Sequence, residues 1–250
     1  LEFRRVLFRS LLAFKPDETI ASVLSIPGYE AAAYLVIATR TGMVKKSKLS
    51  DYDTNRQGGI IAINLAQGDE VIGARLIAGN QDIFLASRKG MSVRFTASDD
   101  QLRPMGRDTR GVIGMRFREG DSLLSMDVVR PGCDVVTITD GGFAKRTKEQ
   151  EWTARGRGTL GVRAMRIDDK RGTLVAAMMC NDDDQLFAIA ESGVVIRTAV
   201  SEIRPSGRDT MGVTIMRVEG EDGVVAVARS EEHAVISDND GSTDRKSTRL

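Results

Sequence analysis

Residues 34–48 read Tyr34-Leu-Val-Ile-Ala-Thr-Arg-Thr-Gly-Met-Val-Lys-Lys-Ser-Lys48, an apolar run followed by a glycine turn and a basic segment. The apolar run has the length of a buried strand, and Arg-Thr-Gly suits a tight hairpin because glycine accepts a positive φ. The same succession returns at 83–90, 135–142 and 186–193, and the glycines that end the four turns are 48, 52 and 51 residues apart. This period predicts a repeated β unit.

A second glycine marks the same period independently. Gly59, Gly111, Gly161 and Gly212 are spaced by 52, 50 and 51 residues, and each precedes another apolar strand. A short acidic turn and a fourth strand complete the unit, and four strands per unit are typical of propeller blades. We therefore predict an all-β, propeller-like ring with blades at 34–80, 82–131, 133–181 and 184–230. Residues 11–30 are expected to form the second half of an earlier blade, which makes about four and a half blades.

The two ends of the chain differ from the repeat. Residues 5–10 and 244–250 can be back-translated to one DNA string and its reverse complement, which is typical of a sequencing or cloning adaptor. We therefore interpret 1–10 and 244–250 as adaptor-derived extensions, and 232–243 as a polar tail.

Composition excludes several kinds of chemistry. The chain contains one histidine, His233, and two cysteines, Cys133 and Cys180, too few for a zinc site or a disulfide scaffold. No stretch approaches 18 consecutive apolar residues, so we expect no membrane contact. We predict a cytoplasmic protein with no catalytic residues, no metal site and no cofactor in this segment.

Charge is balanced overall but partitioned within the repeat. The formal net charge is +1, and residues 11–240 alone hold 30 basic and 33 acidic residues. The stretches 39–58, 88–111, 145–166 and 197–217 contain 22 basic and 9 acidic residues, against 8 basic and 24 acidic in the rest of 11–240. Because equivalent positions of similar blades lie on the same side of a ring, basic residues that recur at one position of the repeat should form one rim. This partition predicts salt-dependent contact with the phosphates of double-stranded DNA, without readout of base sequence.

We expect the phosphate contacts to come from strand cations that follow the first hairpin and from arginines of the glycine-bearing loops. The alternative for each is a solvated strand face or, for Arg107 and Arg208, an ion pair with Asp108 or Asp209 that holds the loop. We expect Trp152 to pack between blades, and replacement of Lys45, Lys46 and Lys48 by Glu to weaken binding with little thermal loss. The candidate residues are Lys45, Lys46, Lys48, Arg56, Arg94, Arg107, Lys145, Arg146, Lys148, Arg155, Arg157, Arg197 and Arg208.

Three segments resemble the carboxy-terminal domain of the DNA gyrase A subunit, with actinobacterial gyrases nearest. They are 34–47, Leu102-Arg-Pro-Met-Gly-Arg-Asp-Thr-Arg-Gly-Val112 and Gly141-Gly-Phe-Ala-Lys-Arg-Thr147. The resemblance implies a β-pinwheel, whose blades exchange strands and wrap DNA around a basic rim. It also implies a holoenzyme that introduces negative supercoils with ATP. The cleavage tyrosine, the ATPase of the gyrase B subunit, ATP and Mg²⁺ would then act elsewhere in an A2B2 assembly.

The wrapping motif of this family, the gyrase box, reads Gln-Arg-Arg-Gly-Gly-Lys-Gly. Arg155-Gly-Arg-Gly-Thr-Leu-Gly161 is a degenerate copy, in which the glycines are expected to shape the loop. Two alternatives stay open from the sequence. One is the carboxy-terminal domain of the topoisomerase IV A subunit, and the other is a protein-interaction propeller of the chromosome-condensation-regulator type.

Overall fold

The computed structural model describes residues 18–56, 59–220 and 222–230. These residues form short antiparallel strands, and single-turn 3-10 helices follow β2, β9 and β13. The strands are β1 (Tyr34–Thr39), β2 (Met43–Lys48), β3 (Val71–Ile77), β4 (Asp82–Ser87), β5 (Met91–Thr96), β6 (Val112–Ile113), β7 (Leu123–Val128), β8 (Asp134–Thr139), β9 (Phe143–Lys148), β10 (Val162–Arg163), β11 (Leu174–Cys180), β12 (Gln185–Ala190), β13 (Val195–Ala199), β14 (Val213–Thr214) and β15 (Val224–Ser230). The helices are η1 (Leu49–Tyr52), η2 (Glu149–Glu151) and η3 (Val200–Glu202). The all-β prediction is confirmed.

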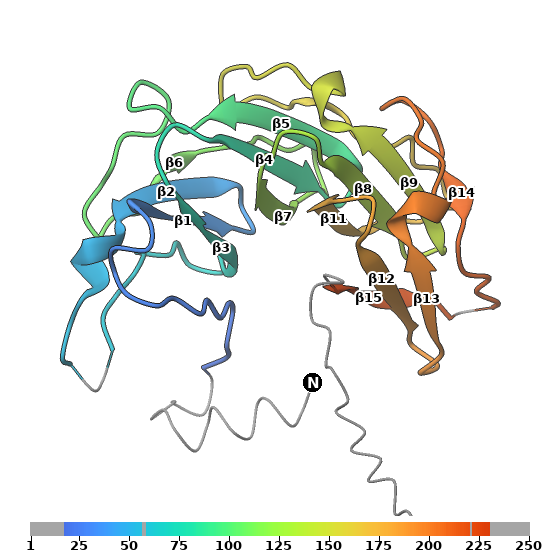
Figure 1. The fold of residues 1–250 in the computed structure, drawn as a ribbon, viewed down its shortest axis with the longest axis horizontal. Coiled ribbons are helices and arrows are strands. Elements are labelled where there is room, and N and C mark those ends of the chain that lie inside the picture. The colour runs from blue at the N-terminus through green and yellow to red at the C-terminus, as the bar shows by residue number, and fades with distance from the viewer. Residues whose placement is uncertain (1–17, 57–58, 221, 231–250) are drawn as a thin grey trace, which may run out of the picture.

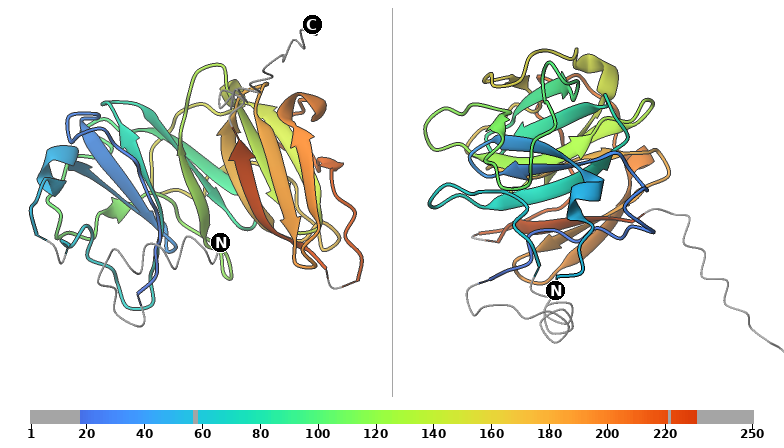
Figure 2. Two further views of the ribbon diagram at one scale, coloured as in Figure 1. Left: turned by 60° about the horizontal axis from the view of Figure 1, so that its bottom comes forward. Right: turned by 90° about the vertical axis from the view of Figure 1, so that its left-hand side faces the viewer.

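The strands form four sheets that follow one another along an arc (Figure 1). The strand orders are β3-β1-β2-β6, β7-β4-β5-β10, β11-β8-β9-β14 and β15-β12-β13. Strands β3, β7, β11 and β15 lie on the concave side, where neighbouring ones pack on each other, whereas β6 and β14 lie toward the convex side (Figures 1 and 2). Successive sheets are therefore blades around a common axis.

Each of the first three sheets takes its outermost strand from the following unit of the repeat. β6 pairs with β2 through Met43↔Ile113 and Val44↔Val112, and β10 and β14 pair with β5 and β9 in the same way. The fourth sheet has three strands in the described part of the chain. Neighbouring blades thus share strands, and the expectation of a β-pinwheel is confirmed.

Gly90 and Gly212, one from each set of repeated glycines, lie where two units touch. Gly90 (φ +78°) ends the β4–β5 hairpin, and Gly212 (φ +75°) precedes β14. A Cβ on Gly90 would meet the carbonyl oxygen of Met165 at 2.7 Å, and a Cβ on Gly212 would meet that of Ala144 at 2.5 Å. Glycine is needed there both for the left-handed backbone and for the close passage of the neighbouring unit.

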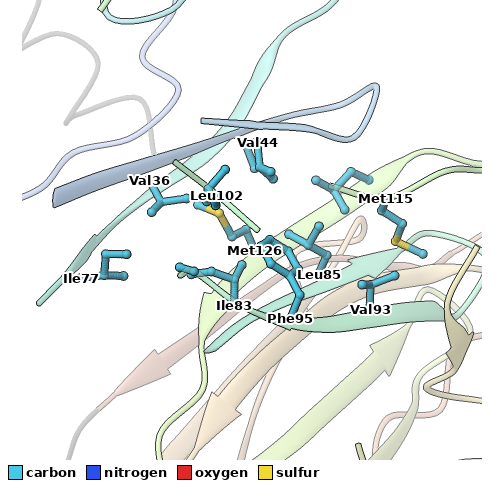
Figure 3. Packing of buried hydrophobic residues seen from close by; sticks show 13 residues of the cluster. Val36, Val44, Ile77, Ile83, Leu85, Val93, Phe95, Leu102, Met115 and Met126 are labelled. Atoms are coloured by element: carbon cyan, nitrogen blue, oxygen red, sulfur yellow. The ribbon is translucent and has the colours of Figure 1, made fainter. Parts of the chain in front are cut away.

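The apolar core is shared between units. Figure 3 shows a cluster that joins Val36 and Val44 of the first sheet to Leu85 and Phe95 of the second, with Leu102 from the chain that follows β5. Burying a side chain of this kind contributes about 1.5–3 kcal/mol. Much of that stabilisation crosses the border between units, as in other repeat proteins in which each unit depends on its neighbours.

Segments outside the sheets add no strand to them. Residues 18–33, which include the described part of the predicted earlier half-blade 11–30, carry no strand. The predicted adaptor-derived ends 1–10 and 244–250, and the polar tail 232–243, lie outside the described residues.

Candidate nucleic-acid interface

Three connections of the repeat lie on the convex side of the arc, and we call them the outer loops (Figure 1). They are residues 97–111, 149–161 and 200–212, which lead from β5 to β6, from β9 to β10 and from β13 to β14. One buried side chain anchors each of them: Leu102, Trp152 or Ile203, exposed by 0, 3 and 1 %. Each anchor packs on the sheet of the preceding unit. An outer loop therefore belongs to one unit by sequence and covers the unit before it.

Trp152 packs as the sequence predicts. Its ring meets that of Phe84 edge to face, with 5.2 Å between the centroids, and its Nε1 donates to Ser92 Oγ at 2.8 Å. The indole joins two blades, and no face of it is free to stack on a base.

The structure contradicts the predicted phosphate contacts of five strand cations. Lys45 and Lys46 are 0 % exposed, Lys145 is 1 % and Arg146 is 4 % exposed, and the Arg94 side chain is 19 % exposed. Each lies on the second strand of its repeat unit and bonds to the following unit. Because their charged groups are covered, these cations cannot reach a polyanion at the surface.

One contact recurs at all three junctions between units, and we call it the junction clamp. A cation at one fixed position of the second strand donates to the first carbonyl of the next outer loop, and its own carbonyl accepts an N–H from the same loop. The donor pairs are Lys46 Nζ to Ala97 O at 2.6 Å, Arg94 Nη1 to Glu149 O at 3.0 Å and Arg146 Nη1 to Val200 O at 3.2 Å. The return bonds run from Met105 N, Arg155 N and Ser206 N, at 2.7, 2.8 and 2.8 Å.

Carboxylates complete each clamp. Asp99 lies 3.0 Å from Lys46 Nζ, and Arg94 is held between Asp82 at 2.7 Å and Glu149 at 2.6 Å. Arg146 contacts Asp134, which is 1 % exposed, and Asp182. The loss of one partner from such a buried pair is strongly destabilising. The expectation that Glu at Lys45 and Lys46 would leave thermal stability almost unchanged therefore does not agree with the structure.

The fourth unit supplies a comparison. Arg197 of β13 has the same repeat position as Lys46, Arg94 and Arg146, and no outer loop follows to cover it in the described residues. Arg197 is exposed, and its Nε donates to Gln185 Oε1 at 3.3 Å. Burial of a clamp cation thus depends on the next unit and not on the strand position itself.

The remaining predicted residues differ in exposure. Lys48, Arg56, Lys148 and Arg155 are exposed, although Lys148 Nζ lies 3.2 Å from Asp134. Arg157 is half-buried and turned back: Nη1 donates to Ile113 O at 2.9 Å, and Nε donates to Gln101 O. Gly158 and Gly161 both have φ +71°, so the glycines of the degenerate box shape the loop as predicted.

Arg107 and Arg208 lie half-buried on the first and third outer loops. Arg208 Nη1 donates to Arg163 O at 3.1 Å, and its Nε has no partner among the described residues. The predicted Arg208–Asp209 pair is not formed, because Asp209 is bound by Arg163 at 3.1 Å and Arg166 at 3.2 Å. Those carboxylate contacts are exposed and contribute little to stability.

Further exposed cations lie outside the set of predicted phosphate contacts. Arg103, Arg110 and Arg204 are exposed on the outer loops, and Arg116, Arg166 and Arg217 are exposed just after the short outermost strands. A repeated Met-Arg dipeptide, at 115–116, 165–166 and 216–217, is the sequence signal that marks the second group. Exposed positive charge therefore lies on the outer loops and their continuations, in addition to the exposed strand residues Lys48, Lys148 and Arg197.

The buried ammonium groups of Lys45 and Lys145 make stability depend on pH above 8. Burial lowers the pKa of each lysine from 10.5 to about 8. Between these values the unfolded chain binds more protons, so the free energy of unfolding rises with pH, whereas below pH 8 these groups add no slope. We expect a rise of up to about 1.4 kcal/mol per pH unit for each lysine.

Urea unfolding of the native chain and of K45M/K145M, from about pH 7 to about pH 10, measures this term. Subtracting the variant's free energy of unfolding from that of the native chain at each pH removes the contribution of the groups that both proteins share. The difference should rise between pH 8 and 10, because only the native chain contains Lys45 and Lys145. A difference that falls between pH 8 and 10 would contradict it.

The described residues form neither a metal cluster nor a membrane-spanning helix. No group of three or more His, Cys, Asp or Glu side chains there is placed to hold a metal ion. No helix among them is long and apolar enough to cross a membrane. Burial raises the pKa of the Cys180 thiol to about 12, which agrees with a packing role.

The repeat units correspond to a known family. Segments 33–78, 81–130, 134–181 and 184–231 match the family model described as "DNA gyrase C-terminal domain, beta-propeller". The chain belongs to the family of DNA gyrase A C-terminal domains. The resemblance seen in the sequence is thereby confirmed.

Actinobacterial gyrase A subunits are similar over most of the chain. The Streptomyces coelicolor subunit is 54% identical over 228 residues, which cover 89% of this chain and 27% of that protein. The Mycobacterium tuberculosis subunit is 50% identical over 225 residues, which cover 90% and 27%. The chain thus spans about a quarter of the length of these curated relatives.

Solved structures share the gyrase C-terminal fold. A C-terminal domain of DNA topoisomerase IV matches with a TM-score of 0.82 at 26% identity, over 90% of this chain and 70% of that one. A DNA gyrase A C-terminal domain matches with a TM-score of 0.78 at 24% identity, over 89% and 74%. The fold is common to both enzymes, and the much higher identity to gyrase subunits places this chain with gyrase.

Proposed function

We propose that the chain binds duplex DNA through its phosphates along the outer loops, without reading base sequence, and wraps it around the convex side of the arc. The observation that carries this proposal is that every outer loop exposes arginine: Arg103 and Arg110 on the first outer loop, Arg155 on the second and Arg204 on the third. Arg103 and Arg204 occupy the same repeat position, eight residues before Gly111 and Gly212. Cations that recur along a convex surface can follow a bent polyanion, and contacts spread over several blades offset the cost of bending the duplex.

Membership of the gyrase A family supports a proposal for the setting of this activity. We propose that the chain serves the rest of the gyrase A subunit and the gyrase B subunit, in an A2B2 enzyme of the cytoplasm that introduces negative supercoils. DNA cleavage, ATP and Mg²⁺ would act outside this segment. In this proposal the chain contributes the geometry of the bound DNA, and none of its side chains takes part in bond making or breaking.

Salt dependence tests the binding surface. The variant R103A/R107A/R110A removes three cations from the first outer loop. Each phosphate that an arginine no longer neutralises should reduce the slope of log affinity against log salt by about 1, so we expect a reduction of up to about 3 for linear duplex DNA. Fluorescence anisotropy over a salt series measures the slope.

The matched control removes equal charge from another part of the same unit. R88A/K89A/R118A changes three cations that are exposed in turns outside the outer loops. The control should keep the native slope. Equal reductions in both variants would assign the binding to bulk charge, and a native chain with no salt dependence would rule out phosphate contact.

A further inference from the structure

Two buried lysines each hold the backbone of an outer-loop arginine. Lys45 Nζ donates to Ala62 O at 2.5 Å and to the carbonyl oxygen of Arg107. Lys145, at the equivalent position two units later, donates to Gly207 O at 3.1 Å and to the carbonyl oxygen of Arg208. In both cases an ammonium from one unit fixes the peptide of an arginine in the next unit.

The three arginines at this repeat position differ in their side-chain contacts. In the middle outer loop Val93 replaces the lysine on β5, and Arg157 turns back onto Gln101 O and Ile113 O. Arg208 also turns back, through Nη1 to Arg163 O at 3.1 Å, and its Nε is buried without a partner in the described residues. Arg107, whose carbonyl Lys45 holds, makes no side-chain hydrogen bond or ion pair within the described part of the chain.

The charge of Lys45 opposes a return of the Arg107 guanidinium. Lys45 Nζ donates to the Arg107 carbonyl oxygen, so the ammonium lies next to the peptide from which the Arg107 side chain starts. Asp108 and Asp51 are the acidic groups that act on this ammonium, and Arg107 is the basic one. Like charges repel where water screens them poorly, so the Arg107 guanidinium is disfavoured from folding back over the lysine.

We propose that Lys45 is a positioning residue for DNA, which holds the peptide of Arg107 so that this guanidinium group faces phosphates. Lys45 itself does not touch DNA. This inference rests on the proposed function, and it assigns to a buried side chain the availability of the arginine that would make the contact. The middle loop, without a lysine, contributes through Arg155 and not through Arg157.

A double-mutant cycle separates positioning from general stability. Met has nearly the length of lysine and no charge, so K45M keeps the packing of the stem and removes the donors. We expect K45M to weaken binding of a linear duplex about fivefold, with little change in Tm, and to have no further effect in the R107A background. In the R204A background, on a different outer loop, K45M should weaken binding by the same factor as in the native chain.

Anisotropy titrations at fixed salt measure the four affinities of each cycle, and emission of the single tryptophan, Trp152, reports that the middle loop stays docked. Unchanged affinity in K45M overturns the proposal, as does an equal weakening with and without Arg107, because the lysine would then act through the fold as a whole. If K45M does not fold, K45L with R107A forms the same cycle.

Failure of the proposed function has a different signature. If the native chain does not bind duplex DNA at low salt, DNA binding is rejected whatever the lysines do. Amide exchange of residues 106–110 then judges the holding contact alone: faster exchange in K45M supports it, and unchanged exchange rejects it.

Discussion

Replacing Arg146 with Met is expected to lower the free energy of unfolding by about 3–5 kcal/mol, the cost of breaking a buried ion pair by removing one partner. Asp134 is 1 % exposed and would keep its charge with only Lys148 Nζ, at 3.2 Å, to pair with. The carbonyl of Val200 would lose a donor as well, and that carbonyl opens the third outer loop. The junction between the third and fourth units should therefore separate first. Urea unfolding followed by far-UV circular dichroism measures the destabilisation.

The chain contains its own control for this substitution. Arg197 occupies the same repeat position on β13, is exposed, and has no outer loop above it in the described part of the chain. Met at Arg197 should change the free energy of unfolding by less than about 0.5 kcal/mol, as is usual for an exposed site. Equal destabilisation at the two positions would mean that Arg146 acts through strand propensity or overall charge and not through the clamp.

The sequence predicts the same role for Arg146 and Arg197, yet Arg146 is buried and Arg197 is exposed. Glycine spacing predicted hairpins and blades correctly, because the left-handed φ of Gly90 and Gly142 is a property of the local chain. The exchange of β6, β10 and β14 between sheets came from the family resemblance alone. A strand of two residues, such as Val112–Ile113, has no periodicity that could assign it to another unit.

The position of a residue within the repeat does not determine its exposure. For this reason the prediction that the strand cations lie at the surface was wrong. Lys45, Lys46 and Ser47 are buried in succession, although a half-exposed strand would alternate. The outer loop of the next unit covers the face that alternation assigns to solvent. Carbonyl and carboxylate oxygens of that loop replace water around the cations, which makes their burial tolerable.

The two kinds of cation depend on each other. Clamp cations such as Lys46 and Arg94 dock the outer loops, and the docked loops carry the exposed arginines, among them Arg103 and Arg155. A charge that recurs in phase was therefore a correct signal of a repeated role, but that role is joining units. The proposed binding surface lies on the outer loops, which the contacts between units hold in place.

Gly212→Ala tests the exchange of strands at one of these contacts. The left-handed backbone, φ +75°, costs an L-residue about 1–2 kcal/mol, and the added Cβ would lie 2.5 Å from the carbonyl oxygen of Ala144. Since that oxygen belongs to the backbone of β9, β14 must move away, and we expect a total destabilisation of about 3–4 kcal/mol.

Gly59 has the same place in the repeat and a similar φ of +73°, with nothing within 4 Å of its Cβ position. Gly59→Ala should therefore show only the backbone cost. Urea unfolding of both variants measures the difference, which is the contribution of close passage between units, and equal destabilisation would show that strand exchange does not require glycine.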